Sequence, residues 1–199
     1  MKKLTIGSLT LSNNIVQAPL AGYSCGPFRV IAEKYGQPGF CTTEMISAKH
    51  LIQSNCRLRR YLGKMPHEGI LCYQFAANEP EILGRATALV SKFYQADMID
   101  LNCGCPMKKI RSKGTGSYLL TQPERIYALV RAMKENTEGI VSIKIRISGT
   151  AQDHNDFEVV GAAESAGVDF ITVHGRHWTE KYDIPCDYAA IAKIVKYAK

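Results

Sequence analysis

The 199-residue sequence has no Cys-x-x-Cys pair, no long hydrophobic run and only one tryptophan. Zinc sites built from cysteine use such closely spaced pairs, so their absence argues against a structural zinc site, and we expect no metal. A membrane span needs about 18 consecutive apolar residues, so we expect no membrane contact. The amino terminus also lacks the apolar stretch of a signal peptide. Together these absences predict a cytoplasmic protein.

The seven cysteines are scattered along the chain, and their number is odd. They are Cys25, Cys41, Cys56, Cys72, Cys103, Cys105 and Cys186. Cytoplasmic cysteines remain reduced, so most of these are expected to pack in the core as small hydrophobic residues. Cys103 and Cys105 differ from the rest because they lie in a turn, NCGCPMKK, that follows an apolar segment. At this point metal binding, a disulfide and acid–base chemistry are all open to them.

Basic residues outnumber acidic ones, with 25 Lys and Arg against 18 Asp and Glu and a formal net charge of +7. Such an excess suits a polyanionic partner such as a nucleic acid, although it is also found in merely basic proteins. The hydrophobic fraction of 46% is typical of a globular chain, and the length suffices for one sizeable core.

Short apolar segments alternate with stretches of helical pattern, which predicts βαβ units and a parallel sheet. A hairpin is predicted over residues 3–11, strands over 14–19, 39–44, 69–75, 98–102, 141–146 and 169–175, and helices over 26–35, 48–62, 80–93, 123–136, 155–166 and 187–197. Successive strands begin roughly 26 to 30 residues apart, with one gap of about 43, close to the ~30 residues per unit of a (β/α)8 barrel. The predicted fold class is therefore α/β, a TIM-type (β/α) barrel with about six of its eight strand–helix units.

Polar residues within the predicted strands share one face, which in a barrel points inward. In the strand over residues 141–146, Lys144 and Arg146 lie on the face opposite three β-branched apolar residues. A buried lysine needs a partner, so we favour a site over a salt-bridged lysine on an edge strand. Cys103 falls on the helix-facing side and is expected to pack. The predicted inward-facing polar residues are Gln74, Asn102, Ser142, Lys144, Arg146, Thr172 and His174.

Seven segments of the chain resemble the tRNA-dihydrouridine synthases. They are QAPLAGYSCGPFR (17–29), TEMISAK (43–49), YQFAANEP (73–80), IDLNCGCPMKKI (99–110), GTGSYLL (114–120), IKIR (143–146) and VHGR (173–176). The order of GCP after a strand that ends in asparagine, then KIR, then HGR is specific to this family. A dihydroorotate dehydrogenase relative, or another TIM-barrel flavin oxidoreductase, shares the flavin chemistry but not this order.

The resemblance implies an FMN-dependent enzyme in which NADPH reduces the flavin. Hydride then passes to C6 of a uracil flipped out of tRNA, and a cysteine protonates C5. Matched motif by motif, Cys105 is the acid. The implied flavin contacts are Pro19, Leu20, Ala21, Gln74, Lys144 and His174. The implied substrate contacts are Asn102, Arg146 and Tyr182, with Lys108 and Lys109 on the RNA.

Elementary chemistry agrees with these implied roles. A cysteine thiol ordinarily has a pKa of about 8.5, so it is protonated at neutral pH and can donate a proton. A lysine ammonium supplies positive charge where a reduced flavin becomes anionic. The basic residues directly after Cys105 suit contacts with phosphate, which weaken as the salt concentration rises, although a solvated loop would show the same pattern.

The family also has two further barrel strands that bind the FMN phosphate and a carboxy-terminal helical domain that binds tRNA. Residues 1–199 match only the barrel, so the sequence predicts one truncated FMN-binding barrel domain without the helical domain. We expect it to bind FMN weakly or not at all, unless a missing segment or a partner chain completes the barrel. The alternatives to an oxidoreductase are a non-catalytic remnant and a weak RNA-binding fragment.

Overall fold

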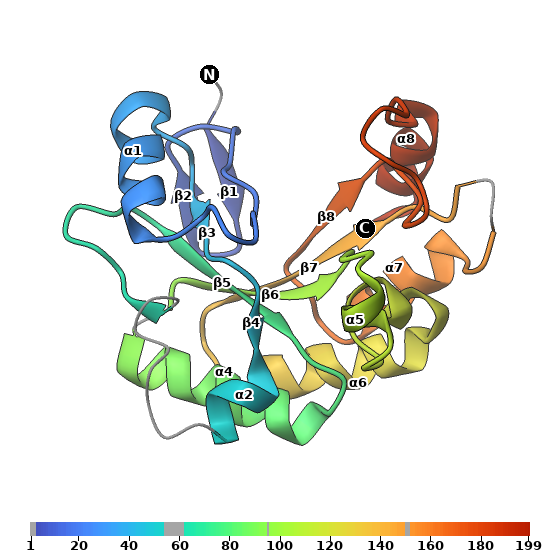
Figure 1. Ribbon diagram of the computed structural model, residues 1–199, viewed down its shortest axis with the longest axis horizontal. Coiled ribbons are helices and arrows are strands. Elements are labelled where there is room, and N and C mark those ends of the chain that lie inside the picture. The colour runs from blue at the N-terminus through green and yellow to red at the C-terminus, as the bar shows by residue number, and fades with distance from the viewer. Residues whose placement is uncertain (1–2, 54–61, 95, 150–151) are drawn as a thin grey trace.

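The computed structural model describes residues 3–53, 62–94, 96–149 and 152–199. Six strands form its main sheet, and every pairing between them is parallel. They are β3 (Cys41–Thr42), β4 (Ile46–Ser47), β5 (Leu71–Ala76), β6 (Met98–Cys103), β7 (Ile140–Arg146) and β8 (Phe170–His174). The order β3-β5-β6-β7-β8 follows the chain, and the sheet curls as a partial barrel (Figure 1). The predicted fold class is confirmed.

The first two predicted strands differ from the prediction. Residues 14–19 form no regular strand, although Gln17 makes an isolated parallel bridge with Cys41. The segment predicted over residues 39–44 is replaced by two short strands, β3 and β4, on either side of Thr43. The hydroxyl of Thr43 accepts a hydrogen bond from the backbone N–H of Gln74 at 3.1 Å. A side chain therefore takes the place of a backbone acceptor, which interrupts the ladder here.

Helices follow the strands, as predicted, and two further short helices lie between β6 and the helix predicted over residues 123–136. They are α1 (Gly26–Gly36), α2 (Ala48–Gln53), α4 (Pro80–Tyr94), α5 (Lys108–Arg111), α6 (Pro123–Lys134), α7 (Asp156–Ser165) and α8 (Tyr188–Tyr197), with a 3-10 helix, η1, over Gly116–Thr121. Cys56 and most of the predicted helix beyond α2 lie outside the described residues. Asn155 and Asp187 cap α7 and α8, because their side chains accept hydrogen bonds from backbone N–H groups of the first turn. None of the helices in the described ranges combines the length and apolar character needed to cross a membrane.

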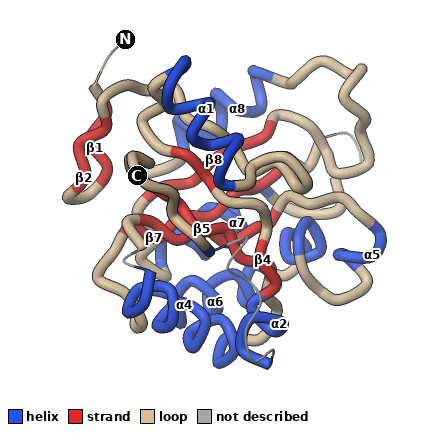
Figure 2. Tube along the Cα trace, turned by 60° about the vertical axis from the view of Figure 1, so that its left-hand side comes forward, coloured by secondary structure: helices blue, strands red, loops and turns tan. Residues whose placement is uncertain are grey.

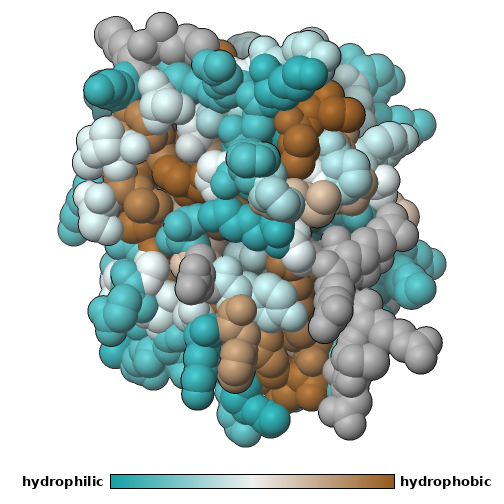
Figure 3. All heavy atoms as spheres, turned by 90° about the vertical axis from the view of Figure 1, so that its left-hand side faces the viewer, coloured by the Kyte–Doolittle hydropathy of each residue, from teal (hydrophilic) through white to brown (hydrophobic). Residues whose placement is uncertain are grey.

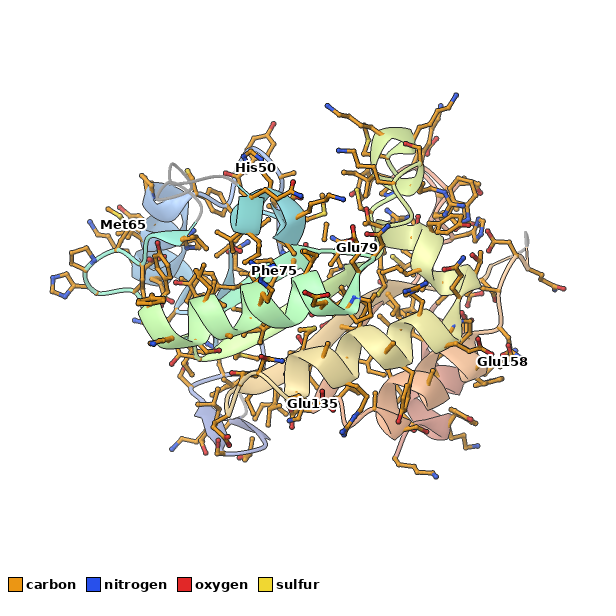
Figure 4. The ribbon with its side chains drawn as sticks, turned by 90° about the horizontal axis from the view of Figure 1, so that it is seen from below. His50, Met65, Phe75, Glu79, Glu135 and Glu158 are labelled. Carbon is orange, nitrogen blue, oxygen red and sulfur yellow. The ribbon has the colours of Figure 1, made fainter. Side chains whose placement is uncertain are left out.

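The main apolar core lies between the outer face of the sheet and the helices. Figure 4 shows α4 and α6 side by side beneath the sheet, where Phe75 of β5 lies in the layer they cover. Val141, Ile143 and Ile145 of β7 are fully buried in the same core, as the alternation in that strand predicts. Cys103 is also part of it, which confirms its predicted packing role. The other face of each strand therefore lines the inside of the curled sheet.

A second, smaller apolar cluster closes the amino ends of the strands. The hairpin of β1 (Leu4–Ile6) and β2 (Leu9–Leu11) is antiparallel, as predicted. Its apolar side chains pack against inward-facing residues at the start of four strands and in the segment before β3. The buried members of the cluster are Ile6, Leu11, Phe40, Cys72, Met98 and Ile140, with Leu9, Ile70 and Phe170 partly buried beside them. The hairpin is therefore the floor of the partial barrel, and the view of Figure 2 shows it to one side of the strands.

The surface near the hairpin and α1 is mixed in character. Figure 3 faces this side and shows hydrophobic patches between hydrophilic residues. The exposed apolar side chains of these elements are Leu4, Ile31 and Tyr35, which are 41%, 57% and 77% exposed. Scattered exposed apolar residues are ordinary on globular proteins, and we assign no function to them.

Two aspartates support strands from their amino ends. Asp97 Oδ2 accepts hydrogen bonds from the backbone N–H of Leu71 at 3.1 Å and from Lys64 Nζ at 3.0 Å. Asp169 repeats this arrangement, with the N–H of Val141 at 2.7 Å and Lys134 Nζ at 2.9 Å. Each carboxylate thus supplies the acceptor for the N–H of a neighbouring strand.

Replacing Asp169 with alanine is expected to lower the free energy of unfolding by about 1–3 kcal/mol, because the N–H of Val141 loses its acceptor in a partly buried place. Urea denaturation measures the change. Asp169→Asn keeps an acceptor oxygen and should cost less. An equal loss in the two variants would show that the hydrogen bond to Val141 is not the cause.

Candidate functional site

The inner face of the sheet changes from apolar to polar along the strands. In β6, Met98 belongs to the floor cluster, whereas Asp100 and Asn102 follow it on the same face. In β7, Ile140 is succeeded by Ser142, Lys144 and Arg146 in the same way. Strands of a parallel sheet end at the same edge, so these columns gather polar groups at the carboxyl ends. This is the end at which barrels of this type carry their sites.

A pocket of about 470 Å³ opens at this end. It is lined by every residue predicted as the catalytic acid, a flavin contact or a uracil contact: Pro19, Leu20, Ala21, Gln74, Asn102, Cys105, Lys144, Arg146, His174 and Tyr182. Tyr23, Met45, Gly104 and Pro106 complete the lining. The structure therefore brings together side chains from four strands and their loops, over a sequence range of more than 160 residues. Lys108 and Lys109 are not part of this lining; they lie exposed on α5.

Asp100 lies at the centre of a buried hydrogen-bond network beneath the pocket. Its carboxylate accepts hydrogen bonds from Ser142 Oγ at 2.6 Å and from Gln74 Nε2 at 2.8 Å. Gln74 Oε1 in turn accepts from Asn102 Nδ2 at 2.8 Å. The network fixes the orientation of both amides. Asp100 was not among the predicted inward-facing residues, although it alternates in phase with Asn102, so the same pattern could have found it.

Burial shifts the ionisation of the groups around this network. Removal from water raises the pKa of Asp100 to about 6, although hydrogen bonds from Ser142 and Gln74 and the charge of Lys144 oppose the shift. Burial also lowers the pKa of Lys144, against the attraction of Asp100. The pKa of His174 falls to about 4, because burial is reinforced by the nearby cations Arg146, Lys144 and Arg176. The His174 ring is therefore neutral at pH 7.

Asn102 shapes the turn that presents Cys105. Its Oδ1 accepts hydrogen bonds from the backbone N–H of Gly104 at 3.1 Å and of Cys105 at 2.9 Å. The carbonyl of Cys105 is held by Ser117, which donates from both its hydroxyl at 2.9 Å and its backbone N–H at 3.1 Å. The thiol of Cys105 is free and half-buried at the pocket. One amide side chain thus joins the polar network to the turn that carries the thiol.

Arg146 connects the turn to the loop after β8. Its Nε donates to the carbonyl of Gly104 at 3.0 Å, and its Nη1 donates to the carbonyl of His177 at 2.9 Å. In the same loop, Tyr182 is 79% exposed, and its ring stacks on the His174 ring with centroids 6.2 Å apart. Arg176 holds this segment by donating to the carbonyl of Tyr182 at 3.2 Å. Tyr182 therefore forms the solvent-facing rim of the pocket.

The basic residues after Cys105 are of two kinds: some are exposed to solvent, and one packs against other side chains. Lys108 and Lys109 point to solvent. Arg111 instead stacks its guanidinium on Trp178, with 3.5 Å between its Cζ and the ring centroid, and donates to Ser117 Oγ at 3.0 Å. Trp178 therefore packs between loops. Among these basic residues only the lysines remain free of such packing.

The backbone conformation at position 116, beside the pocket, requires glycine. Its φ is +64°, and an added Cβ would lie 2.8 Å from both the carbonyl oxygen of Cys105 and Ile110 Cγ2. Gly116→Ala is expected to lower the free energy of unfolding by about 1–3 kcal/mol, because it combines a strained φ with a clash against backbone. Thermal and urea denaturation measure the loss. Gly36→Ala is the control, since a Cβ there meets nothing within 4 Å; a similar loss in both variants would contradict the explanation.

The fold and the pocket together define a class of protein. The chain is an α/β protein of partial barrel type, with one convergent set of amide, thiol, cationic and imidazole groups at the carboxyl ends of its strands. Ligands bind at this end in barrels of this type.

Comparison with known proteins identifies the family. The family model "Dihydrouridine synthase (Dus)" matches residues 16–198, and the chain belongs to this family. A "Probable tRNA-dihydrouridine synthase" from Helicobacter pylori is 33% identical over 92% of this chain and 55% of its own length. A "tRNA-dihydrouridine synthase B" from Pasteurella multocida is 31% identical over 96% of this chain and 57% of its own length. The chain thus spans less than two thirds of the length of these relatives, and the predicted resemblance is confirmed.

A solved structure supports the fold alone. The variant of NCR from Zymomonas mobilis aligns with a TM-score of 0.60 at 15% sequence identity, covering 99% of this chain and 75% of that one. The long alignment at such low identity shows a common architecture.

Proposed function

We propose that this chain carries the catalytic barrel of a tRNA-dihydrouridine synthase. The reaction adds two hydrogens across the C5–C6 double bond of a uracil in tRNA, a hydride at C6 and a proton at C5, while NADPH is oxidised to NADP⁺. The observation that carries the proposal is the convergence of Cys105, Asn102 and Lys144 in one pocket. The tRNA substrate also favours a cytoplasmic location.

The pocket fits the isoalloxazine ring of FMN by its chemistry. Pro19, Leu20 and Ala21 offer a short apolar segment against which a flat ring can lie. Gln74 and Lys144 offer an amide and an ammonium to polar ring atoms. Within the described residues the Lys144 ammonium makes no hydrogen bond, so it is available to a ligand acceptor. Bound FMN would supply the hydride and be reduced again by NADPH.

His174 would contribute a neutral ring to the same contacts. Its pKa of about 4 means that it carries no charge at pH 7, so it can accept as well as donate a hydrogen bond. Its Nε2 lies 3.1 Å from Arg176 Nη1, and that guanidinium can only donate. The second ring nitrogen is then the one that bears the proton. His174 would thus offer an N–H donor to the cofactor.

Cys105 would act as the general acid. Its place at the pocket, in a turn held by Asn102 and Ser117, keeps the sulfur in a defined position. A thiol donates one proton to carbon C5 and is then a thiolate, which regains a proton from solvent. Asn102 and Arg146 line the same pocket and would contact the uracil, with Tyr182 at the rim. Positioned proton donors of this kind accelerate reactions by about 10²- to 10⁴-fold.

The flipped base would enter from the side where the exposed lysines lie. A base inside a folded tRNA is stacked, so it has to leave its stack to reach a pocket of this size. Lys108 and Lys109 lie three and four residues after Cys105 and are exposed to solvent. They would contact the RNA backbone, and such contacts add affinity without reading sequence. The uridine position that is modified depends on more of the tRNA than this pocket can touch.

The test is a product assay on the chain as it exists. An unmodified tRNA transcript is incubated with the chain, NADPH and excess FMN, and dihydrouridine is measured by mass spectrometry of nucleosides. The proposal expects dihydrouridine to form in step with NADPH oxidation. Salt-dependent tRNA binding without product, under saturating FMN, would overturn it in favour of an RNA-binding fragment. NADPH oxidation that is indifferent to tRNA would instead indicate another flavin oxidoreductase.

A further inference from the structure

A cluster of two histidines and an aspartate lies outside the pocket. Asp153 follows β7 in the chain, and His177 follows β8. Asp153 Oδ1 lies 2.7 Å from His154 Nδ1 and 3.0 Å from His177 Nε2. One ligand atom from each of these three residues lies within 4.8 Å of the other two. His154 and His177 show no metal-ligand spacing in the sequence, so no role was predicted for them.

We propose that Asp153, His154 and His177 bind a zinc ion. Imidazole nitrogen and carboxylate oxygen are ligands that zinc prefers, at about 2.0–2.2 Å, and three protein ligands leave a fourth position for water. Two ring nitrogens already converge on one carboxylate oxygen, so modest side-chain adjustment would seat an ion among them. The proposal uses only residues of this chain and does not rest on the proposed function.

The surroundings of the cluster match those of a metal site. A metal-binding histidine usually donates its other ring N–H to an oxygen, which fixes the ring. The other ring nitrogen of His177, Nδ1, lies 2.8 Å from Thr179 Oγ1 and also accepts a hydrogen bond from the backbone N–H of Thr179 at 3.3 Å. Metal binding at Nε2 would move the ring proton to Nδ1, which would then donate to the Thr179 hydroxyl in place of that contact. His154 Nε2 is buried and makes no hydrogen bond, yet Asp156 Oδ1 lies only 3.2 Å away. With His154 Nδ1 on a metal, its proton resides on Nε2 and faces that carboxylate.

The carboxylate ligand is also oriented by a neighbour. Asp153 Oδ2 accepts a hydrogen bond from the indole N–H of Trp178 at 2.5 Å. Oδ1 is thereby left to face both histidines. The side chains of His154 and His177 are each only 1% exposed, whereas that of Asp153 is 28% exposed. The ligands are therefore shielded from bulk water, and an ion can reach them past Asp153.

A zinc ion here would tie the loop after β7 to the loop after β8, which carries Tyr182 of the pocket lining. The loop after β7 supplies two ligands and the loop after β8 supplies the third. The carbonyl of His177 also accepts a hydrogen bond from Arg146, a pocket residue. The segment that leads to Tyr182 begins at this point. A bound ion would therefore hold the loop after β8 beside the pocket, while its fourth position stays open to water.

Metal titration tests the proposal directly. The chain is stripped with a chelator, desalted and titrated with Co²⁺ and with Zn²⁺ by calorimetry and absorption. Trp178 is the only tryptophan, and its indole contacts Asp153, so its fluorescence reports on this site. We expect one ion per chain, quenching of Trp178 by Co²⁺, and no thiolate charge-transfer band. A thiolate band, or no binding, would overturn the proposal.

Matched variants locate the ion. Asp153→Asn and His154→Gln each remove a ligand and should weaken binding at least tenfold. Asp156→Asn should weaken it by about 10- to 100-fold, because it alters the partner of His154 rather than a ligand. His67→Asn is the control, since His67 is an exposed histidine far along the chain from this cluster. Circular dichroism verifies that each variant is folded. Equal affinity in Asp153→Asn and the parent chain would overturn the assignment.

Discussion

Replacing Cys105 with alanine is expected to lower the rate of dihydrouridine formation by about 10²- to 10⁴-fold, the usual contribution of a positioned proton donor. The backbone of the turn should survive, because Asn102 and Ser117 bind main-chain atoms of residue 105 rather than its side chain. The free energy of unfolding and the affinity for tRNA should therefore change little. Single-turnover assays with saturating tRNA, FMN and NADPH measure the loss.

Cys186→Ala is the matched control for this variant. Cys186 is also a free, half-buried cysteine, and it does not line the pocket. Its replacement should leave the rate within about twofold of the parent chain, a margin well below the effect of losing an acid. Equal rates in the two variants would remove Cys105 from the mechanism without affecting the family assignment. Recovery of part of the activity in Cys105→Ser would support proton donation.

Asp100→Asn is expected to flatten the pH dependence of stability between about pH 4 and pH 7. The pKa of Asp100 is raised from 3.8 to about 6 in the folded chain, so the folded state holds this proton more tightly than the unfolded state. Its stabilising contribution is complete below about pH 4 and is lost as the pH rises through about 6. The raised pKa corresponds to about 3 kcal/mol. Asparagine cannot titrate and should not show this loss.

The measurement is urea denaturation of both chains from pH 4 to pH 7. The free energy of unfolding of the parent minus that of Asp100→Asn should fall as the pH rises. Asp97→Asn is a control, because Asp97 is a partly exposed aspartate at the base of the same strand. A difference that stays constant with pH for Asp100→Asn would contradict the raised pKa. The same variant also removes the negative charge that faces Lys144, so Lys144 should lose its proton more readily.

The alternation of residues within strands predicted much of the pocket. In β7 it placed Lys144 and Arg146 on the inner face, and the structure has both in the pocket lining. Each strand of a curled parallel sheet has one inner face, so the parity of a few residues suffices to identify it. The family motifs then assigned roles that parity cannot assign. Those roles stay predictions until they are measured.

Other features could not be predicted because they depend on partners distant in sequence. The strand is interrupted at Thr43 because the Thr43 hydroxyl accepts a hydrogen bond from the backbone N–H of Gln74. Residues 39–44 alone do not predict this contact. The cluster of Asp153 and His177 likewise exists only because two neighbouring strands place their loops together.

The hairpin floor limits the directions from which a ligand can reach the pocket. Apolar packing covers the amino ends of the strands, and the pocket of the described residues opens at their carboxyl ends. A cofactor at the bottom of this pocket would lie beneath an incoming nucleotide, and a bound polymer would cover it. Only a nucleotide that protrudes from the polymer could enter the part of the pocket above the cofactor. Ile6 and Leu11 pack at the amino ends of the strands, opposite the carboxyl ends that carry the turn of Cys105, so a cofactor and a nucleotide would share the opening at the carboxyl ends.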